Sequence, residues 1–227
     1  MDDLEIDVVK NDLHKNEKSK EIWEKPIVHS LLNAVSMIPF AAPIVSGLAK
    51  IVDNELAKQI KKRCEVVILL LMESDSVSFE DVQDIEFIME FAHLLDAVTR
   101  TRSISKIKYM SQLFHTTMCN GIRKYDVYEE CLLELSTMSE REIQVLVELY
   151  IIQHCRPDVP FKNRGKVFYT KMRDVYDEDE KMVDTLLSKL RRSGFCIEEL
   201  GPYASGSGIE YNITPYGIQF MKYILEV

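Results

Sequence analysis

Glycine and proline are scarce in this sequence: its 227 residues include 8 glycines and 7 prolines. An all-β sandwich or barrel needs turn residues at short, regular intervals, so this scarcity argues against such folds and in favour of helices. Hydrophobic residues make up 46% of the chain and charged residues 29%. That balance is typical of a globular protein rather than a disordered one. The length suffices for one large domain or two modest ones.

Cysteine pairing motifs are also lacking. The chain has an odd number of cysteines, widely scattered and without a Cys-x-x-Cys pair: Cys64, Cys119, Cys131, Cys155 and Cys196. This pattern argues against a disulfide framework and fits reduced thiols packed as small apolar side chains. The amino-terminal residues Met1–Lys25 are charged throughout and do not resemble a signal peptide. We therefore expect a cytoplasmic protein.

Catalytic motifs are missing as well. The sequence has no glycine-rich phosphate loop, no Gly-x-Ser-x-Gly elbow, no His-Glu-x-x-His pair and no kinase signature. We therefore expect neither an enzyme nor a bound cofactor. An excess of basic residues is absent too, because the net charge is -9. An acidic chain is repelled by phosphate backbones unless its cations gather on one face, so general nucleic-acid binding is disfavoured.

Three groups of residues have a spacing that metal ligands or nucleophiles sometimes share. Glu90 and His93 stand three residues apart, which is half of a di-iron carboxylate site, yet the sequence holds no second copy of that motif. His115 and Cys119 stand four apart without an obvious second pair to complete four ligands. The side chains of the adjacent His154-Cys155 diverge on a helix. We therefore predict no metal site, and we interpret His93 as a helix-surface histidine.

Composition divides the chain into three regions. Residues 1–25 form a polar arm that is expected to order only on a partner. Residues 26–49 contain no charged side chain and are long enough to span a bilayer. Pro39 and Pro43 would each break a spanning helix, so we favour two short apolar helices with a turn between them. A membrane-active hairpin is the alternative.

Helical periodicity continues from Ile44 to Met72, where basic side chains at positions 58 and 61–63 are expected on a solvated face. Ser78 is expected to cap the next helix, because acidic residues and then an apolar stripe follow it. Further helices are expected at about 103–119 and 125–135. The region 26–138 is therefore predicted to be a helical bundle suited to self-association or partner docking.

The carboxy-terminal region 139–227 combines helices with two short strands. Ser139 opens a capping box with Glu142, and helices are expected near 143–154, 167–176 and 178–192. Gly194 marks the end of the third helix. Strands are expected at 195–200 and 209–213, on either side of a glycine-rich tip. Thr214 and a following proline predict the start of the last helix.

This order of three helices, a two-stranded wing and a final helix resembles the winged-helix fold. The residues that carry the resemblance are Leu186, Leu187, Leu190, Gly194, Phe195 and the segment 211–217. The rest of the chain resembles uncharacterised bacterial and prophage helical proteins through its apolar segment, its basic helix and residues 101–109. A winged helix implies a macromolecular contact made by its third helix and wing, while the fold alone does not fix the partner.

The third helix of this module begins with four acids at positions 177–180, where a recognition helix would meet DNA bases. Region 139–227 holds 12 Lys or Arg against 14 Asp or Glu, a net charge of -2. We therefore expect a non-enzymatic interaction protein, with a protein partner and homo-oligomer formation. A DNA-binding regulator and a membrane-active effector acting through residues 26–49 are the alternatives. The candidate contact residues are Lys181, Thr185, Ser188, Lys189, Arg192 and Tyr203.

Overall fold

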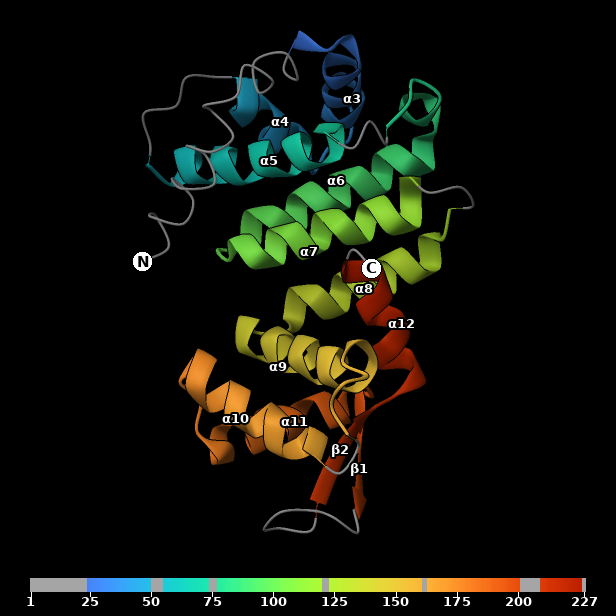
Figure 1. Ribbon diagram of the computed structural model, residues 1–227. Helices are drawn as coiled ribbons and strands as arrows, with labels where there is room; N and C mark the ends of the chain where they lie inside the picture. Colours follow the sequence, from blue (N-terminus) through green and yellow to red (C-terminus); the bar gives the residue numbers. More distant parts are fainter. Residues whose placement is uncertain are drawn as a thin grey trace. The chain divides into compact units, whose positions relative to one another are not determined.

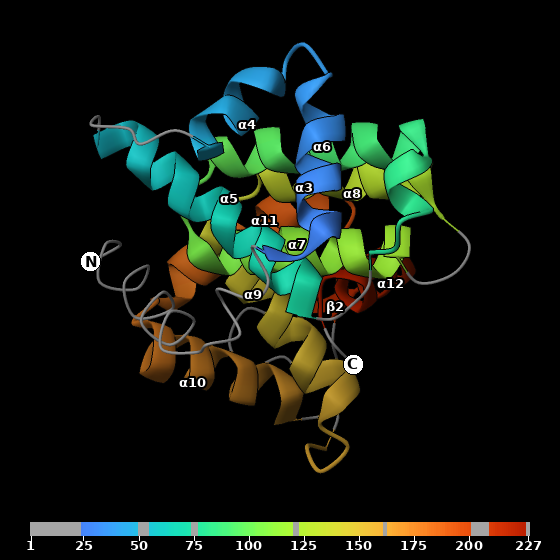
Figure 2. The same cartoon turned by 90° about the horizontal axis from the view of Figure 1, so that it is seen from above.

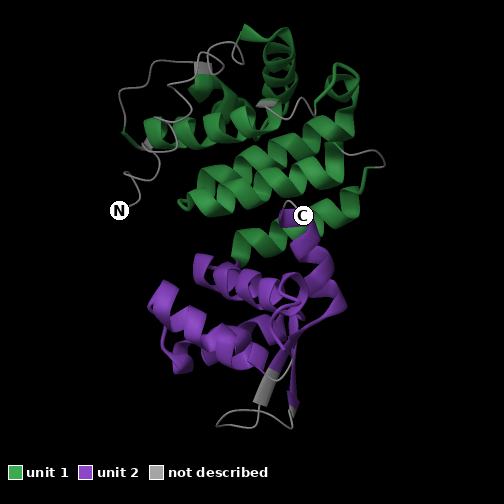
Figure 3. Cartoon of the chain, in the orientation of Figure 1, with its two compact units in different colours: residues 1–137 green, residues 138–227 purple. Residues whose placement is uncertain are grey.

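The computed structural model describes residues 24–49, 55–73, 77–119, 123–160, 163–200 and 209–225. These residues are mainly helical and include one small antiparallel sheet near the carboxy terminus, as predicted. The chain divides into two compact units, unit 1 at residues 1–137 and unit 2 at residues 138–227 (Figure 3). The predicted arm at 1–25 falls almost wholly outside the described residues. None of the described helices combines the length and the apolar character that a bilayer crossing requires.

Unit 1 is built from α-helices that pack side by side (Figures 1 and 2). Helix α5 packs against α6 and α7, while α8 packs against the same two helices. A five-residue π-helical turn, His115–Cys119, extends the end of α7. The elements are α3 (Pro26–Ser36), α4 (Ala42–Ala49), α5 (Glu55–Glu73), the short 3-10 helix η1 (Asp81–Gln83), α6 (Ile85–Arg100), α7 (Ile104–Phe114) and α8 (Tyr125–Thr137).

The uncharged segment 26–49 folds as two short helices joined by a turn, because Pro39 lies in that turn and Pro43 lies in the first turn of α4. One side of this pair contributes buried residues to the core of unit 1: Val28, Leu31, Val35, Ile38, Ala41, Val45 and Leu48. Deletion of the whole segment would therefore expose the core. The turn itself carries exposed apolar side chains, and Met37 is 85% exposed.

An aromatic cluster fills the centre of unit 1. Phe114 lies edge-on to Phe87, Phe91 and Tyr128 at centroid distances of 5.2–5.7 Å. Edge-to-face pairs of this kind add about 0.5–1.5 kcal/mol each beyond the burial of their area. The Tyr128 hydroxyl is buried and donates to the Glu90 carbonyl at 3.4 Å, which joins α8 to α6. The cluster thereby sets the spacing between these two helices.

Two sequence-based predictions for unit 1 are wrong. Ser78 does not cap the next α-helix; it exchanges hydrogen bonds with Asp81 around η1, and Asp84 caps α6 by accepting from the Glu86 amide at 2.9 Å. The basic face of α5 is not solvated throughout, because Arg63 is buried and donates to the Thr99 carbonyl at 3.3 Å. That carbonyl lies in the last turn of α6, where a cation is favourable.

Unit 2 consists of α9 (Glu140–Tyr150), α10 (Arg164–Tyr176), α11 (Glu180–Arg192), strands β1 (Cys196–Leu200) and β2 (Ile209–Ile213), and α12 (Pro215–Ile224). A π-helical turn, Ile151–Cys155, extends α9. The two strands are antiparallel, with Cys196 opposite Ile213 and Leu200 opposite Ile209. Helix α11 packs on α9, α10 and β1, while α12 packs on α9.

The start and stop signals of unit 2 act as the sequence predicts. The Ser139–Glu142 capping box forms, with the Ser139 amide donating to the Glu142 carboxylate at 2.7 Å. Gly194 ends α11 with φ at 79°, and Phe195 donates to the Leu190 carbonyl at 3.0 Å, a Schellman ending. Thr214 caps α12 by accepting from the Gly217 amide at 3.0 Å.

The core of unit 2 contains three of the residues that carry the winged-helix resemblance. Leu187 and Phe195 are fully buried, and Ile213 is 7% exposed. Gln153, in the π-helical turn, binds the outer edge of β2: its amide donates to the Tyr211 carbonyl at 2.8 Å and accepts from the Ile213 amide at 3.0 Å. A side-chain amide thus satisfies the strand edge that a further strand would otherwise occupy.

Candidate functional sites

Helix α11 presents two different faces. Its apolar face is buried through Val183, Leu186, Leu187 and Leu190. The opposite face exposes Lys181 and Thr185, while Ser188 lies half-buried at its border. Three of the candidate contact residues therefore occupy one side of the helix. Tyr203 lies outside the described residues, in the segment between the strands.

The four acids at positions 177–180, around the start of α11, do not all face solvent as free charges. Glu178 is buried and forms an ion pair with Arg141. Asp179 is the helix cap and accepts from the Met182 amide at 2.9 Å. Asp177 adopts a left-handed conformation at the end of α10, with φ at 55°. Much of this acidic run therefore has a structural explanation, as a link between two helices.

The outward face of α11 has a further acid. Asp184 is exposed and accepts a hydrogen bond from the Tyr169 hydroxyl of α10 at 2.6 Å. This contact fixes a carboxylate beside Thr185 in the middle of the face. A DNA phosphate would meet that carboxylate unfavourably, whereas a protein backbone amide or a basic side chain would not.

About half of the cations that the structure describes in unit 2 form ion pairs with acids of the same unit. Lys189, a candidate contact residue, lies 3.8 Å from Glu142. Among the described residues, no acidic partner is seen for Lys181 or Arg192. Ion pairs elsewhere in the unit join Arg141 to Glu178, Arg156 to Asp158, Lys171 to Glu148, Arg173 to Asp174, and Arg191 to Glu198. These pairs therefore cancel part of the positive field of the unit.

Unit 2 also exposes apolar side chains on α11 and on two elements that pack against it, α10 and β1. Met182, in the first turn of α11, is 37% exposed; Ile197 of β1 is 45% exposed; Val175 of α10 is 63% exposed. Methionine and aliphatic side chains mixed with uncharged polar ones are typical of protein interfaces.

A second candidate site is a groove of about 520 Å³ in unit 1, lined by α6, α7 and α8. Glu90 and His93 of α6 line it together with Glu129 of α8. The buried cation Lys106 of α7 also lines the groove and donates to the Ser136 carbonyl in the last turn of α8 at 3.1 Å. A concave surface with converging polar groups is the usual setting for a small ligand.

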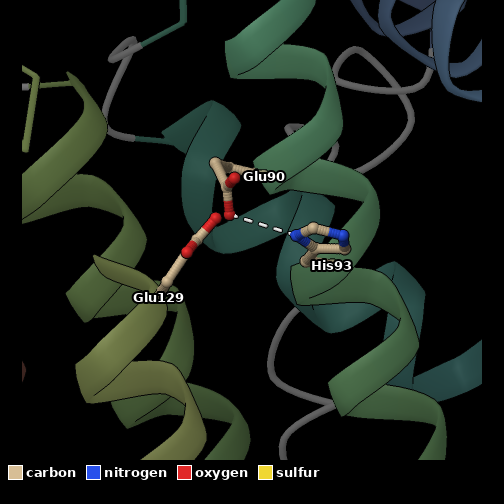
Figure 4. A group of neighbouring side chains, drawn as sticks. All are labelled: Glu90, His93 and Glu129. Carbon is tan, nitrogen blue, oxygen red and sulfur yellow. Dashed lines mark hydrogen bonds and ion pairs between the residues drawn. The ribbon is translucent and has the colours of Figure 1, made fainter. Parts of the chain in front are cut away.

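Glu90, His93 and Glu129 converge at one wall of this groove, with the two carboxylates pointing toward each other (Figure 4). One potential ligand atom from each residue lies within 4.8 Å of the other two. The imidazole Nδ1 of His93 lies 3.2 Å from Oε2 of Glu90. The three side chains differ in exposure: Glu90 is buried, His93 is intermediate and Glu129 is exposed.

The environment of this cluster disfavours a free carboxylate. Burial raises the pKa of Glu90, the neighbouring His93 opposes that shift, and repulsion from Glu129 adds to it. The Phe40 ring stacks on the His93 imidazole at a centroid distance of 5.3 Å and an interplanar angle of 16°. The turn between α3 and α4 thereby restrains the orientation of the imidazole.

In the sequence, Glu90 and His93 have the spacing of half a metal site, but the prediction is no metal site, and Glu129 is not among the candidate residues. The available signal was the position of Glu129 directly after Tyr128, on the border of the buried face that Tyr128, Cys131, Leu132 and Leu135 form. A carboxylate on such a border points along the neighbouring helix. Only the tertiary structure shows that the helix next to Glu129 is α6.

The other pairs noted in the sequence do not join this cluster. His115 and Cys119 lie in the π-helical turn after α7, and burial raises the pKa of the Cys119 thiol to about 12. His154 stacks on Tyr150 at 5.4 Å. Burial lowers the pKa of His154, and Cys155 beside it is exposed.

Comparison with protein-family models, with curated proteins and with solved structures finds no match for this chain. The resemblances to the winged-helix fold and to bacterial and prophage proteins therefore stay predictions.

Proposed function

We propose that this chain is a non-enzymatic interaction protein of bacterial or phage type. In this proposal unit 2 is a winged-helix-like module that contacts a protein partner through the exposed face of α11. Unit 1 is a helical bundle for self-association or partner docking.

The order of elements in unit 2 supports the winged-helix proposal. Helices α9, α10 and α11 precede the antiparallel pair β1 and β2, and α12 follows the pair. The described part of unit 2 has no third strand, and the Gln153 side chain takes that place at the edge of β2. In this fold the third helix is the usual contact element, so α11 is the natural candidate.

The pairing of cations within unit 2 carries the choice of a protein partner. A protein gains affinity for DNA by releasing counterions from phosphates that its cations neutralise. A cation held beside its own carboxylate supplies less of this gain, because the carboxylate repels the phosphate. Lys189 and Arg191 each have such a neighbour, while Met182 and Ile197 offer apolar surface instead.

DNA binding remains the second candidate, and one observation favours it. Glu178 is paired with Arg141, and Asp179 is occupied as the helix cap. The amino-terminal end of α11 is therefore less negative than the sequence alone indicates. Lys181 and Arg192 are both exposed on this helix and could contact phosphates.

Homo-oligomer formation is proposed for the exposed turn of the segment 26–49. Its exposed positions carry no charge, and Met37 and Phe40 are apolar. Exposed apolar surface of this kind commonly marks an interface between subunits. The alternative is that the same turn contacts a membrane surface instead of a second copy of the chain.

Site-specific photo-crosslinking of the full chain tests the proposed partner contact. A photoreactive amino acid replaces Thr185 on the α11 face in one variant and the exposed Gln219 of α12 in the control variant. Both are added to nuclease-treated cell extract, with and without excess unmodified chain. We expect a single protein to crosslink at position 185, to disappear under competition and to be absent from the control. Equal labelling at both positions contradicts the proposal. A parallel reaction in untreated extract gives the other contradicting outcome, which is crosslinking of position 185 to nucleic acid and to no protein.

A further inference from the structure

We infer that Glu90, His93 and Glu129 form a binding site for a divalent transition-metal ion of the zinc class, at the wall of the groove in unit 1 (Figure 4). This site is independent of the α11 face. It joins a Glu-x-x-His pair on α6 to a carboxylate of α8.

The spacing of the ligand atoms suits such an ion. Zinc binds carboxylate oxygens and imidazole nitrogens at about 2.0–2.2 Å, which places tetrahedral ligand atoms about 3.4 Å apart. Nδ1 of His93 and Oε2 of Glu90 are 3.2 Å apart, and the Glu129 oxygen lies within 4.8 Å of both. Because Glu129 is exposed, its side chain has room to rotate toward the other two ligand atoms.

The position of Glu90 gives the second argument. This carboxylate is 6% exposed, yet its described partners are a half-exposed imidazole and a second carboxylate. A buried carboxylate is costly unless a cation offsets its charge. The cation Lys106, which also lines the groove, donates to the Ser136 carbonyl. A divalent ion between Glu90 and Glu129 removes their repulsion and satisfies the buried oxygen.

The donor set selects the class of metal. Magnesium and calcium prefer all-oxygen ligands, whereas imidazole is a common ligand of zinc and the later first-row metals. Phe40 stacks on His93 and holds the ring in one orientation, which is the role that outer partners play at metal sites. Three protein ligands leave at least one coordination position facing the groove, which is open to water or to an acidic group of a partner.

Titration of the purified, chelator-treated full chain with Co²⁺ and Zn²⁺ tests this site. We expect saturable binding of one ion, visible Co²⁺ absorption bands that Zn²⁺ abolishes, and no competition by Mg²⁺. Glu90→Gln, His93→Gln and Glu129→Gln should each weaken binding by about tenfold or more, because loss of even an outer partner costs about 10- to 100-fold. Glu130→Gln is the matched control, since Glu130 is an exposed acid on the same helix outside the cluster, and it should bind as the parent chain does.

Two further readouts separate a true site from misfolding and from binding elsewhere. Without metal, Glu90→Gln should be as stable as the parent or more stable at neutral pH, so its loss of binding cannot come from unfolding. A sulfur-to-cobalt charge-transfer band in the near ultraviolet would place the ion on a cysteine such as the exposed Cys155 and overturn the inference. Absence of saturable binding by the parent chain would also overturn it, as would cluster variants that bind the metal as tightly as the parent does.

Discussion

Replacing Gly217 by alanine tests the packing of α12 against the strands of unit 2. A β-carbon at this position would lie 2.4 Å from the Phe195 carbonyl oxygen and 2.7 Å from Cγ1 of Ile213. Both contacts are far closer than van der Waals separation, and a backbone carbonyl cannot rotate away. Overpacking of this kind costs about 1–3 kcal/mol. Alanine gains up to about 1 kcal/mol over glycine within a helix, so part of that cost is offset. The balance is destabilising.

Gly165 supplies a matched control with the opposite sign. It lies in the first turn of α10, and a β-carbon there would meet nothing within 4 Å. Gly165→Ala should therefore stabilise the chain, by about 0.5–1 kcal/mol at most. Thermal unfolding followed by circular dichroism measures both, since 1 kcal/mol shifts the midpoint by about 4–8 °C in a unit of this size. An equal or greater melting temperature for Gly217→Ala than for Gly165→Ala would refute the packing described for α12.

Three further predictions concern the core, the groove and the exposed turn. Leu187→Ala removes a fully buried side chain and should lower the free energy of unfolding by about 2–5 kcal/mol, whereas Met182→Ala should lower it far less. Equal denaturation midpoints for the two variants would contradict the placement of Leu187 in the core of unit 2. Burial raises the pKa of Glu90 above its ordinary 4.5, so folding favours the neutral carboxyl. Its contribution to the free energy of unfolding is therefore fully present below pH 4.5 and is lost as the pH rises through the folded-state pKa. With a chelator present, the Glu90→Gln variant should therefore melt at a higher temperature than the parent chain at pH 7, and the two melting temperatures should converge near pH 4. If the difference in melting temperature instead grew as the pH fell, the pKa of Glu90 would be lowered by folding and not raised. Met37 is 85% exposed in the turn of the segment 26–49, so Met37→Asp should lower the mass measured by light scattering, and an unchanged oligomer would exclude that turn as the interface.

Local signals in the sequence were enough to predict most boundaries of unit 2. The Ser139 capping box, Gly194 and Thr214 act through hydrogen bonds within a few residues of themselves. Such signals depend little on tertiary context, which is why they could be interpreted in isolation. The burial of Leu187 and Phe195 followed from the same local pattern.

Features that depend on distant residues could not be predicted in this way. Arg123, from the segment before α8, pairs with Asp81 and Asp84 just ahead of α6. Arg63 resembles a solvated cation in sequence, yet it lies under the end of α6. The groove cluster requires the neighbouring positions of α6 and α8, which no spacing within either helix reveals.

The most direct test of the proposed partner class is DNA retention by the full chain as a function of salt. Fluorescence anisotropy with genomic and random duplexes is measured between about 50 and 200 mM salt, the range over which phosphate contacts lose most of their affinity. If unit 2 binds a protein, the parent chain should retain DNA only weakly. The Lys189→Ala and Arg192→Ala variants should then also retain DNA at a level near background. Sequence-selective retention, with a salt slope that each substitution lowers by about one, would contradict the account.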